Sequence, residues 1–161
     1  MGSSGDFDEF FRRELTPLVA FVRRAGFGAQ QAEDAAQEAM AGAYQRWDAL
    51  RSPRAWVRVV ACRTAVVDAR RWRDGVLRAV AAGWVVSVHH DPDVVVLAEE
   101  RRRLLAVLGS LPECRRSAMA WHLDGYDHGE IAERLGTSPA TVRSHLRHAR
   151  DALRPLFAPQ R

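Results

Sequence analysis

The chain has 161 residues, of which 47% are hydrophobic, enough for one or two domains that each bury a core. Its formal net charge is +4 and its 24 basic residues are all arginine, a balance that favours an acidic partner such as nucleic acid. No apolar run approaches the length of a membrane span and the amino end lacks a secretory signal pattern, so we expect a cytoplasmic protein that does not insert into a membrane.

Apolar residues recur at helical spacing almost throughout residues 6–73. The first helix is expected to close at the glycine-containing turn 26–28. A second helix is expected from Gln30 to about Trp47, with alanines along its inner stripe, and Pro53 should start a third helix that runs to residue 73. This first zone is therefore predicted to be helical throughout.

The second predicted helix carries an acidic stripe. Asp34, Gln37 and Glu38 lie at positions i, i+3 and i+4, on the face opposite most of the alanines. A stripe of this kind is more often a solvated helix face than a binding site. Spacing alone leaves both interpretations open.

Residues 74–98 break the helical pattern. Gly75, Gly83 and Pro92 punctuate a stretch that is too apolar for a purely solvated linker, so we expect a connector that packs partly on a domain or a partner. The two adjacent histidines of this stretch cannot face one ion in either regular structure, so no metal site is expected there.

Residues 99–157 return to a helical pattern, and within them residues 127–150 read as two short helices around a tight turn. Gly136 supplies the stop of the first short helix. Thr137 or Ser138, followed by a proline, caps and opens the second.

The second of these short helices is apolar on one side and basic on the others. Its inward stripe is Val142, Leu146 and Ala149 or Leu153. The polar residues left on its other faces are Arg143, Ser144, Arg147, His148 and Arg150. Such side chains suit base edges and phosphates, so we interpret this segment as a helix-turn-helix that enters a DNA groove. The alternative is an amphipathic hairpin with a solvated basic face.

Three segments together carry a family resemblance: residues 32–39, residues 53–61 and the helix-turn-helix. They look like bacterial sigma factors of the sigma-70 family, and so short a chain resembles the extracytoplasmic-function (ECF) group, which keeps only regions two and four. The resemblance implies an all-α fold of two small helical domains. Region two would occupy residues 6–73 and region four residues 99–157, with a linker at 74–98.

The function implied by this resemblance is that of a promoter-specificity subunit, which directs core RNA polymerase to promoters and assists in melting DNA. In the family, the second helix of region two binds the clamp helices of the polymerase's largest subunit, and the matching positions are Asp34, Gln37 and Glu38. Acidic residues facing a basic clamp would give electrostatic steering. The resemblance also implies contact with the polymerase flap and with an anti-sigma partner.

The third predicted helix resembles the part of region two that opens and reads the minus-ten promoter element. Strand opening requires a basic track for phosphates and stacking surfaces for extruded bases. Trp56 and Trp72 are the aromatic candidates, of which Trp56 is expected in the core. The loop at residues 50–54 is shorter than is usual in the family. The basic track would consist of Arg54, Arg58, Arg63, Arg70, Arg71 and Arg73, and many relatives have Asn in place of Arg63.

The helix-turn-helix resembles region four, which reads the minus-thirty-five element. Arginine to guanine is the commonest specific contact in the major groove, so a G-rich upstream element is expected. The base-reading positions of the family map to Arg143, Ser144, Arg147 and His148, with Thr141 and Arg150 placed for phosphate.

An enzyme is not expected. The chain has no glycine-rich phosphate cradle, no metal-spaced set of cysteines or histidines and no nucleophile elbow, so neither catalytic residues nor a cofactor is predicted. Cys62 and Cys114 lie far apart among apolar neighbours and are expected to be buried thiols. The remaining alternative is a stand-alone helix-turn-helix regulator that acts without polymerase. A receiver domain would alternate strands and helices, whereas residues 7–73 read as helical.

Overall fold

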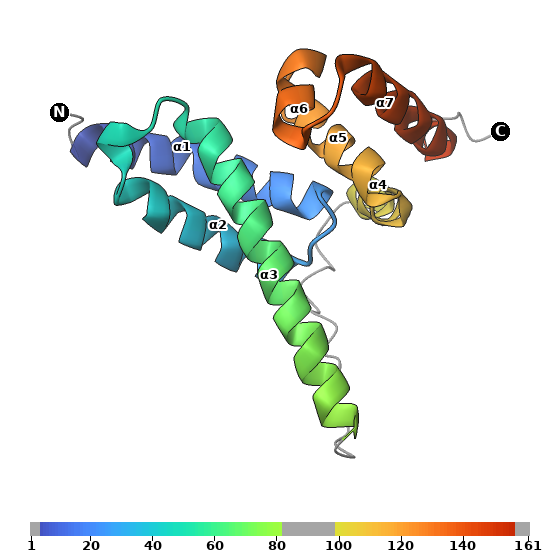
Figure 1. Ribbon diagram of the computed structural model, residues 1–161, viewed down its shortest axis with the longest axis horizontal. Helices are drawn as coiled ribbons and strands as arrows, with labels where there is room; N and C mark the ends of the chain where they lie inside the picture. Colours follow the sequence, from blue (N-terminus) through green and yellow to red (C-terminus); the bar gives the residue numbers. More distant parts are fainter. Residues whose placement is uncertain (1–3, 82–98, 157–161) are drawn as a thin grey trace. The chain divides into compact units, whose positions relative to one another are not determined.

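The computed structural model describes residues 4–81 and 99–156. The chain folds into two compact units (Figure 1). Residues 4–81 and 99–156 contain no strand, which confirms the predicted all-α class, and within these ranges no helix is long and apolar enough to cross a membrane. The first unit is built around α1 (Ser4–Arg24), α2 (Ala29–Tyr44) and α3 (Pro53–Ala81), and the second around α4 (Glu99–Ser110), α5 (Glu113–Leu123), α6 (His128–Leu135) and α7 (Pro139–Leu153).

In the first unit, small side chains let α2 and α3 lie close together. The inner face of α2 is a stripe of alanines, and Ala35, Ala39 and Ala43 are fully buried. Gly42 lies beside this stripe, where an added Cβ would stand 3.2 Å from the Trp56 ring of α3. Alanine favours the helix without adding bulk. The stripe therefore explains both why α2 is helical and how closely α3 approaches it.

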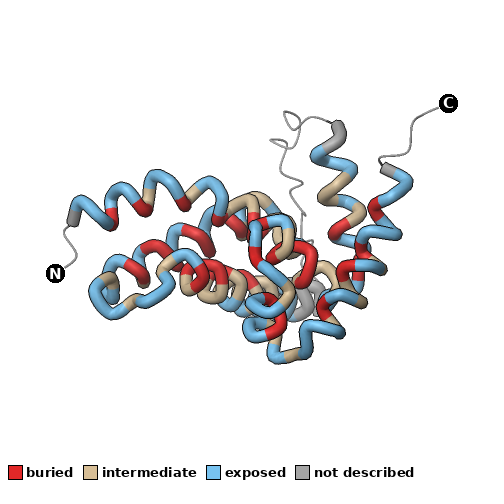
Figure 2. The backbone as a smooth tube through the Cα atoms, turned by 90° about the horizontal axis from the view of Figure 1, so that it is seen from above, coloured by how far each residue is buried: buried red, intermediate tan, exposed pale blue. Residues whose placement is uncertain are grey.

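Large side chains of α1 complete the same core. Leu18, Phe21 and Val22 are almost fully withdrawn from water, and Figure 2 shows how the buried residues line one side of each helix. Phe7 packs edge-on against Trp47 with 5.2 Å between ring centroids, a geometry that aromatic pairs favour. Trp47 does not belong to α2 as the sequence predicts, but to a 3-10 turn, Trp47–Ala49, that follows it.

The third helix is longer than the sequence predicts, because α3 continues past residue 73 to Ala81. A break is predicted at Gly75, but an isolated glycine costs a helix only about 1 kcal/mol relative to alanine. The added turns carry the exposed Arg78, whose Nε donates to the backbone oxygen of Asp74 at 3.2 Å. The rest of the predicted connector, residues 82–98 with its two histidines, lies outside the described residues.

Local caps define the helix-turn-helix of the second unit. Asp127 accepts the backbone N–H of Glu130, and the Glu130 side chain accepts the Asp127 N–H, each at 2.9 Å, which forms a capping box at the start of α6. Gly136 ends α6 with a φ of 64° in the left-handed region. Ser138 then accepts the N–H of Thr141 at 3.1 Å and begins α7. The predicted turn is confirmed, and serine is the cap that is used.

The apolar stripe of α7 packs into the core of the second unit. Val142, Leu146, Ala149 and Leu153 are all buried, so both of the alternatives left open by the sequence contribute. The core is completed by Leu108 of α4, Met119 of α5 and Ile131 of α6, each at most 2% exposed. The polar residues of α7 therefore lie on its outer faces.

The two cysteines differ from each other in environment. Cys62 is half-buried, and burial raises the pKa of its thiol to about 12, in line with the predicted buried thiol. Cys114 is exposed in the first turn of α5, which corrects the prediction that it is buried. The apolar residues near Cys114 in the sequence do not decide its burial, because only some positions of a helix face the core.

Candidate nucleic-acid interface

The outer side of α7 presents a row of arginines. Arg143, Arg147 and Arg150 follow one another at i, i+4 and i+7, so they lie on one side of the helix, and all three are exposed. Thr141, Ser144 and His148, the other residues predicted for this surface, are half-buried. The structure therefore places all six residues predicted for the upstream element on a single helix, with its three arginines exposed.

Hydrogen bonds within α7 orient two of these residues. The Thr141 hydroxyl lies 2.9 Å from the Ser138 hydroxyl at the helix start. His148 has its Nδ1 2.7 Å from the backbone oxygen of Ser144. A carbonyl oxygen only accepts, so this nitrogen carries the proton and donates. The opposite ring nitrogen of His148, Nε2, is then the atom left to face a partner.

Arg150 also contacts a residue of another helix. One of its terminal nitrogens lies 2.9 Å from Nε2 of His122 in α5. Burial, together with the positive charge of Arg150 and the nearby His128, lowers the pKa of His122 from its ordinary value of 6.5. The side chain of Arg150 is thus held by a hydrogen bond to α5 of the same unit.

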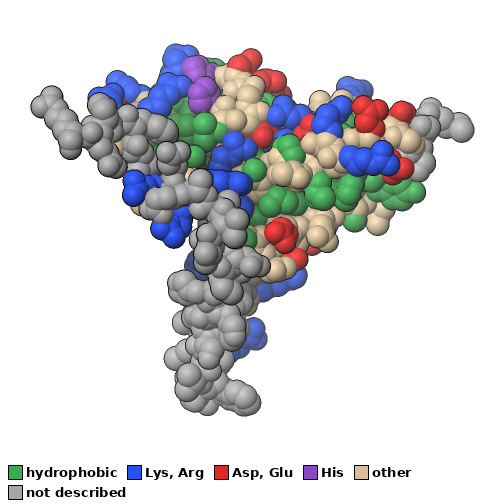
Figure 3. Space-filling view, turned by 180° about the vertical axis from the view of Figure 1, so that it is seen from behind, with side chains coloured by type: hydrophobic (Ala, Val, Ile, Leu, Met, Phe, Trp, Pro, Cys, Tyr) green, Lys and Arg blue, Asp and Glu red, His purple; other side chains and the backbone are tan. Residues whose placement is uncertain are grey.

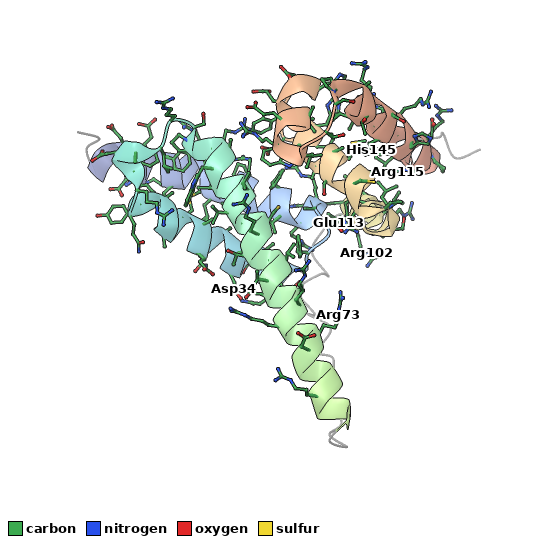
Figure 4. All side chains as sticks on the ribbon, in the orientation of Figure 1. Asp34, Arg73, Arg102, Glu113, Arg115 and His145 are labelled. Atoms are coloured by element: carbon green, nitrogen blue, oxygen red, sulfur yellow. The ribbon has the colours of Figure 1, made fainter. Side chains whose placement is uncertain are left out.

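In the first unit, α3 carries all six arginines predicted for the downstream element. Arg63, Arg70, Arg71 and Arg73 are exposed along its outer length, and Figure 4 shows Arg73 on the part of α3 that extends beyond α1 and α2. Arg54 is half-exposed in the first turn of α3, with its Nε 3.4 Å from Glu14. Arg78 is a further exposed arginine of α3, and it lies beyond the helix end at residue 73 that the sequence predicts.

Burial corrects the prediction for Arg58. Its side chain is fully buried, its guanidinium lies 3.0 Å from a Glu14 oxygen and donates to the backbone oxygen of Arg54 at 2.8 Å. Its guanidinium carbon also lies 5.8 Å from the centre of the Phe21 ring. A side chain held in this way cannot reach a phosphate, so Arg58 is a core residue. The signal for its partner is present in the sequence, since Glu14 interrupts the apolar stripe of α1 four residues before the buried Leu18.

The acidic stripe of α2 faces solvent. Asp34, Gln37 and Glu38 are all exposed, opposite the buried alanines, and Figure 4 shows Asp34 on the outer side of α2. Gln30 donates to the Asp34 carboxylate at 3.0 Å, one turn earlier on the same helix. The three predicted residues form one accessible surface with a negative charge.

These features define a class of protein. A helix-turn-helix with exposed arginines on its second helix belongs to a sequence-reading DNA-binding protein. The first unit adds an exposed acidic surface on α2 and a row of exposed arginines on α3. Within the described residues, no group of three or more histidine, cysteine or acidic side chains is placed to hold a metal.

Comparison with known proteins identifies the family. The family described as Sigma-70 region 2 matches residues 10–74, and Sigma-70, region 4 matches residues 101–153. The ECF RNA polymerase sigma-E factor of Escherichia coli (strain K12) is 32% identical over 134 residues, which cover 74% of this chain and 70% of that protein. The chain belongs to the sigma-70 family of RNA polymerase sigma factors, in the ECF group.

Other relatives carry ECF names as well. The ECF RNA polymerase sigma factor RpoE of Cereibacter sphaeroides is 29% identical over 154 residues, which cover 92% of this chain and 84% of that protein. SigK of Mycobacterium sp. (strain KMS) is 34% identical over 102 residues, which cover 60% of this chain. The matched part spans only 52% of the length of that SigK protein.

Solved structures show the same fold. The sigma factor RpoE from Bartonella quintana, crystallised with the anti-sigma factor NepR, superposes with a TM-score of 0.71 at 21% identity and covers 97% of this chain and 99% of its own. CnrH, solved with the cytosolic domain of CnrY, superposes with a TM-score of 0.66 at 20% identity and covers 97% of this chain and 90% of its own.

Proposed function

We propose that this protein directs core RNA polymerase to a specific set of promoters and helps to open them. The observation that carries the proposal is the presence, in one sigma-family chain, of an exposed acidic stripe on α2 and exposed arginine rows on α3 and α7. A polymerase-docking surface and two DNA-binding surfaces are what a promoter-specificity subunit needs. It would carry out no bond chemistry of its own, and it would act in the cytoplasm with the polymerase.

The second unit would read the upstream element through α7. Arginine can bind the guanine edge with two hydrogen bonds, which is the reason for expecting G at the positions that Arg143 and Arg147 reach. Ser144 and His148 would contact neighbouring base edges, and Thr141 and Arg150 would bind phosphates that fix the register of the helix on the duplex. The support for this assignment is the exposure of the three arginines along one side of α7.

The first unit would bind DNA along α3 and polymerase along α2. Exposed arginines along one helix suit the phosphates of a strand that is being opened, because each ion pair releases counterions. These arginines are Arg54, Arg63, Arg70, Arg71 and Arg73. Asp34, Gln37 and Glu38 would face the clamp helices of the polymerase's largest subunit, and the second unit would meet the flap.

An anti-sigma protein is a further proposed partner. Two similar folds were solved with such partners or their domains, RpoE with the anti-sigma factor NepR and CnrH with the cytosolic domain of CnrY. A protein that covers α2 or α7 would block binding to polymerase or to DNA while leaving the fold intact. The activity of the chain would then depend on the release of that partner.

Transcription in vitro tests the proposal. Core polymerase would be supplied with the full chain and genomic DNA, and transcript ends would be sequenced. We expect start sites that share an upstream and a downstream element and that disappear with an Arg143→Ala/Arg147→Ala variant. If the chain binds DNA but neither co-purifies with core polymerase nor starts transcripts, the alternative of a stand-alone helix-turn-helix regulator is correct instead.

A further inference from the structure

His122 and Arg150 form a hydrogen bond whose direction the chemistry fixes. Nε2 of His122 lies 2.9 Å from a terminal nitrogen of Arg150. A guanidinium has only N–H donors, so the imidazole nitrogen must accept. His122 is therefore neutral, with its proton on Nδ1. The contact joins the last turn of α5 to the last turn of α7 and uses one of the five donors of Arg150.

The surroundings of His122 favour this neutral form. The hollow beside it has a volume of about 490 Å³ and apolar walls from three helices, formed by Leu104, Met119, Leu123 and Leu153. The charged and titratable groups around it are Arg150 from α7, Arg154 from the 3-10 turn that follows α7 (Arg154–Leu156), and His128 from α6, while α4 contributes the apolar Leu104. Burial, Arg150 and His128 all lower the pKa of His122. Figure 3 shows histidine side chains close to arginine side chains on one face of the second unit.

We propose that His122 is a positioning residue for DNA binding, which holds Arg150 so that its remaining donors point to a phosphate beside the upstream element. This inference rests on the proposed function of α7. An arginine side chain loses conformational entropy when it is ordered by binding. A hydrogen bond that already holds one of its nitrogens reduces the entropy that is left to lose when DNA binds. His122 itself contacts no DNA and adds no charge.

Four variants of the full chain test this role in complex with core polymerase, on a promoter fragment mapped by its transcripts. Arg150→Ala should weaken binding and reduce the salt slope of the affinity by about 0.9, the value for one phosphate contact. His122→Ala should weaken binding by about 2- to 10-fold, the range for ordering one long side chain, with the salt slope unchanged. His122→Gln should restore affinity, because its amide oxygen can accept where Nε2 does. In the Arg150→Ala variant, adding His122→Ala should cause no further loss of affinity.

The hydrogen bond can also be measured without DNA. In an NMR titration of the full chain, Arg150→Ala should raise the pKa of His122 toward 6.5, although burial keeps part of the lowering. An unchanged titration would overturn the proposal, as would an equal cost of His122→Ala with and without Arg150. If Arg143→Ala weakens promoter binding while the His122 and Arg150 variants do not, this inference alone is wrong. If Arg143→Ala has no effect either, the proposed function of α7 is wrong.

Discussion

At the scale of single residues, the first unit buries an ion pair. Glu14 and Arg58 are 7% and 0% exposed, and their charged atoms lie 3.0 Å apart. Taking both charges out of water is costly, so such a pair adds little stability over apolar residues of the same shape. Removing one partner is different, because the other charge is then left buried and uncompensated.

We therefore expect Glu14→Gln to lower the free energy of unfolding by about 3 kcal/mol or more. The double variant Glu14→Leu/Arg58→Met should lie closer to the wild type, because it removes both charges together. Urea unfolding of the full chain, followed by circular dichroism, measures the free energy of unfolding of both variants. A loss below about 0.5 kcal/mol for Glu14→Gln would mean that water reaches the pair and screens it.

The proposed base-reading roles of two exposed arginines of α7 can be tested one at a time in a binding assay. Arg143 and Arg147 are exposed one helical turn apart on α7. If each binds a guanine edge, an alanine substitution should cost about 1 to 3 kcal/mol of binding free energy and relax the base preference at one position. A panel of promoter fragments with single base changes measures this. A uniform loss across all fragments would assign that arginine to phosphate, and Arg12→Ala on α1 is a matched control.

At the scale of helices, the sequence predicts what local chemistry decides. Gly136 and Ser138 act on their own backbone neighbours, so the turn before α7 can be predicted from a short segment. The role of Arg58 depends on Glu14, a residue 44 positions away, and no local pattern contains that pairing. The end of α3 is not predictable from the local sequence either, because a glycine weakens a helix without deciding where it ends.

The acidic stripe of α2 gives a prediction at the same scale. Asp34→Lys/Glu38→Lys should weaken binding to core polymerase while leaving the fold intact, because both side chains are exposed. Charges at the edge of an interface act mainly through the association rate, so the defect should grow at low salt. Asp8→Lys/Glu9→Lys changes the net charge equally but lies on α1, and it should bind almost as the wild type does. If the two double variants bind core polymerase equally well in a pull-down, the acidic stripe of α2 is not the docking surface.

At the scale of the whole molecule, the charge is segregated. The net charge is +4, yet α2 presents carboxylates while α3 and α7 present arginines. A chain with its charges evenly mixed would have no preferred orientation toward DNA or toward a basic protein surface. Segregation lets one chain bind partners of opposite sign through different helices, which is the requirement of the proposed function.

Each unit has its own buried core, so the two halves should fold separately and yet work only together. The first core is formed by α1, α2 and α3, and the second by α4 to α7. Fragments 1–90 and 91–161 should each show helical circular dichroism and cooperative thermal unfolding. Mixed with core polymerase, they should fail to start transcripts, because linkage makes the second contact intramolecular and raises its effective concentration. An unfolded fragment would show that the cores depend on each other, and full activity of the mixture would show that the covalent link is dispensable.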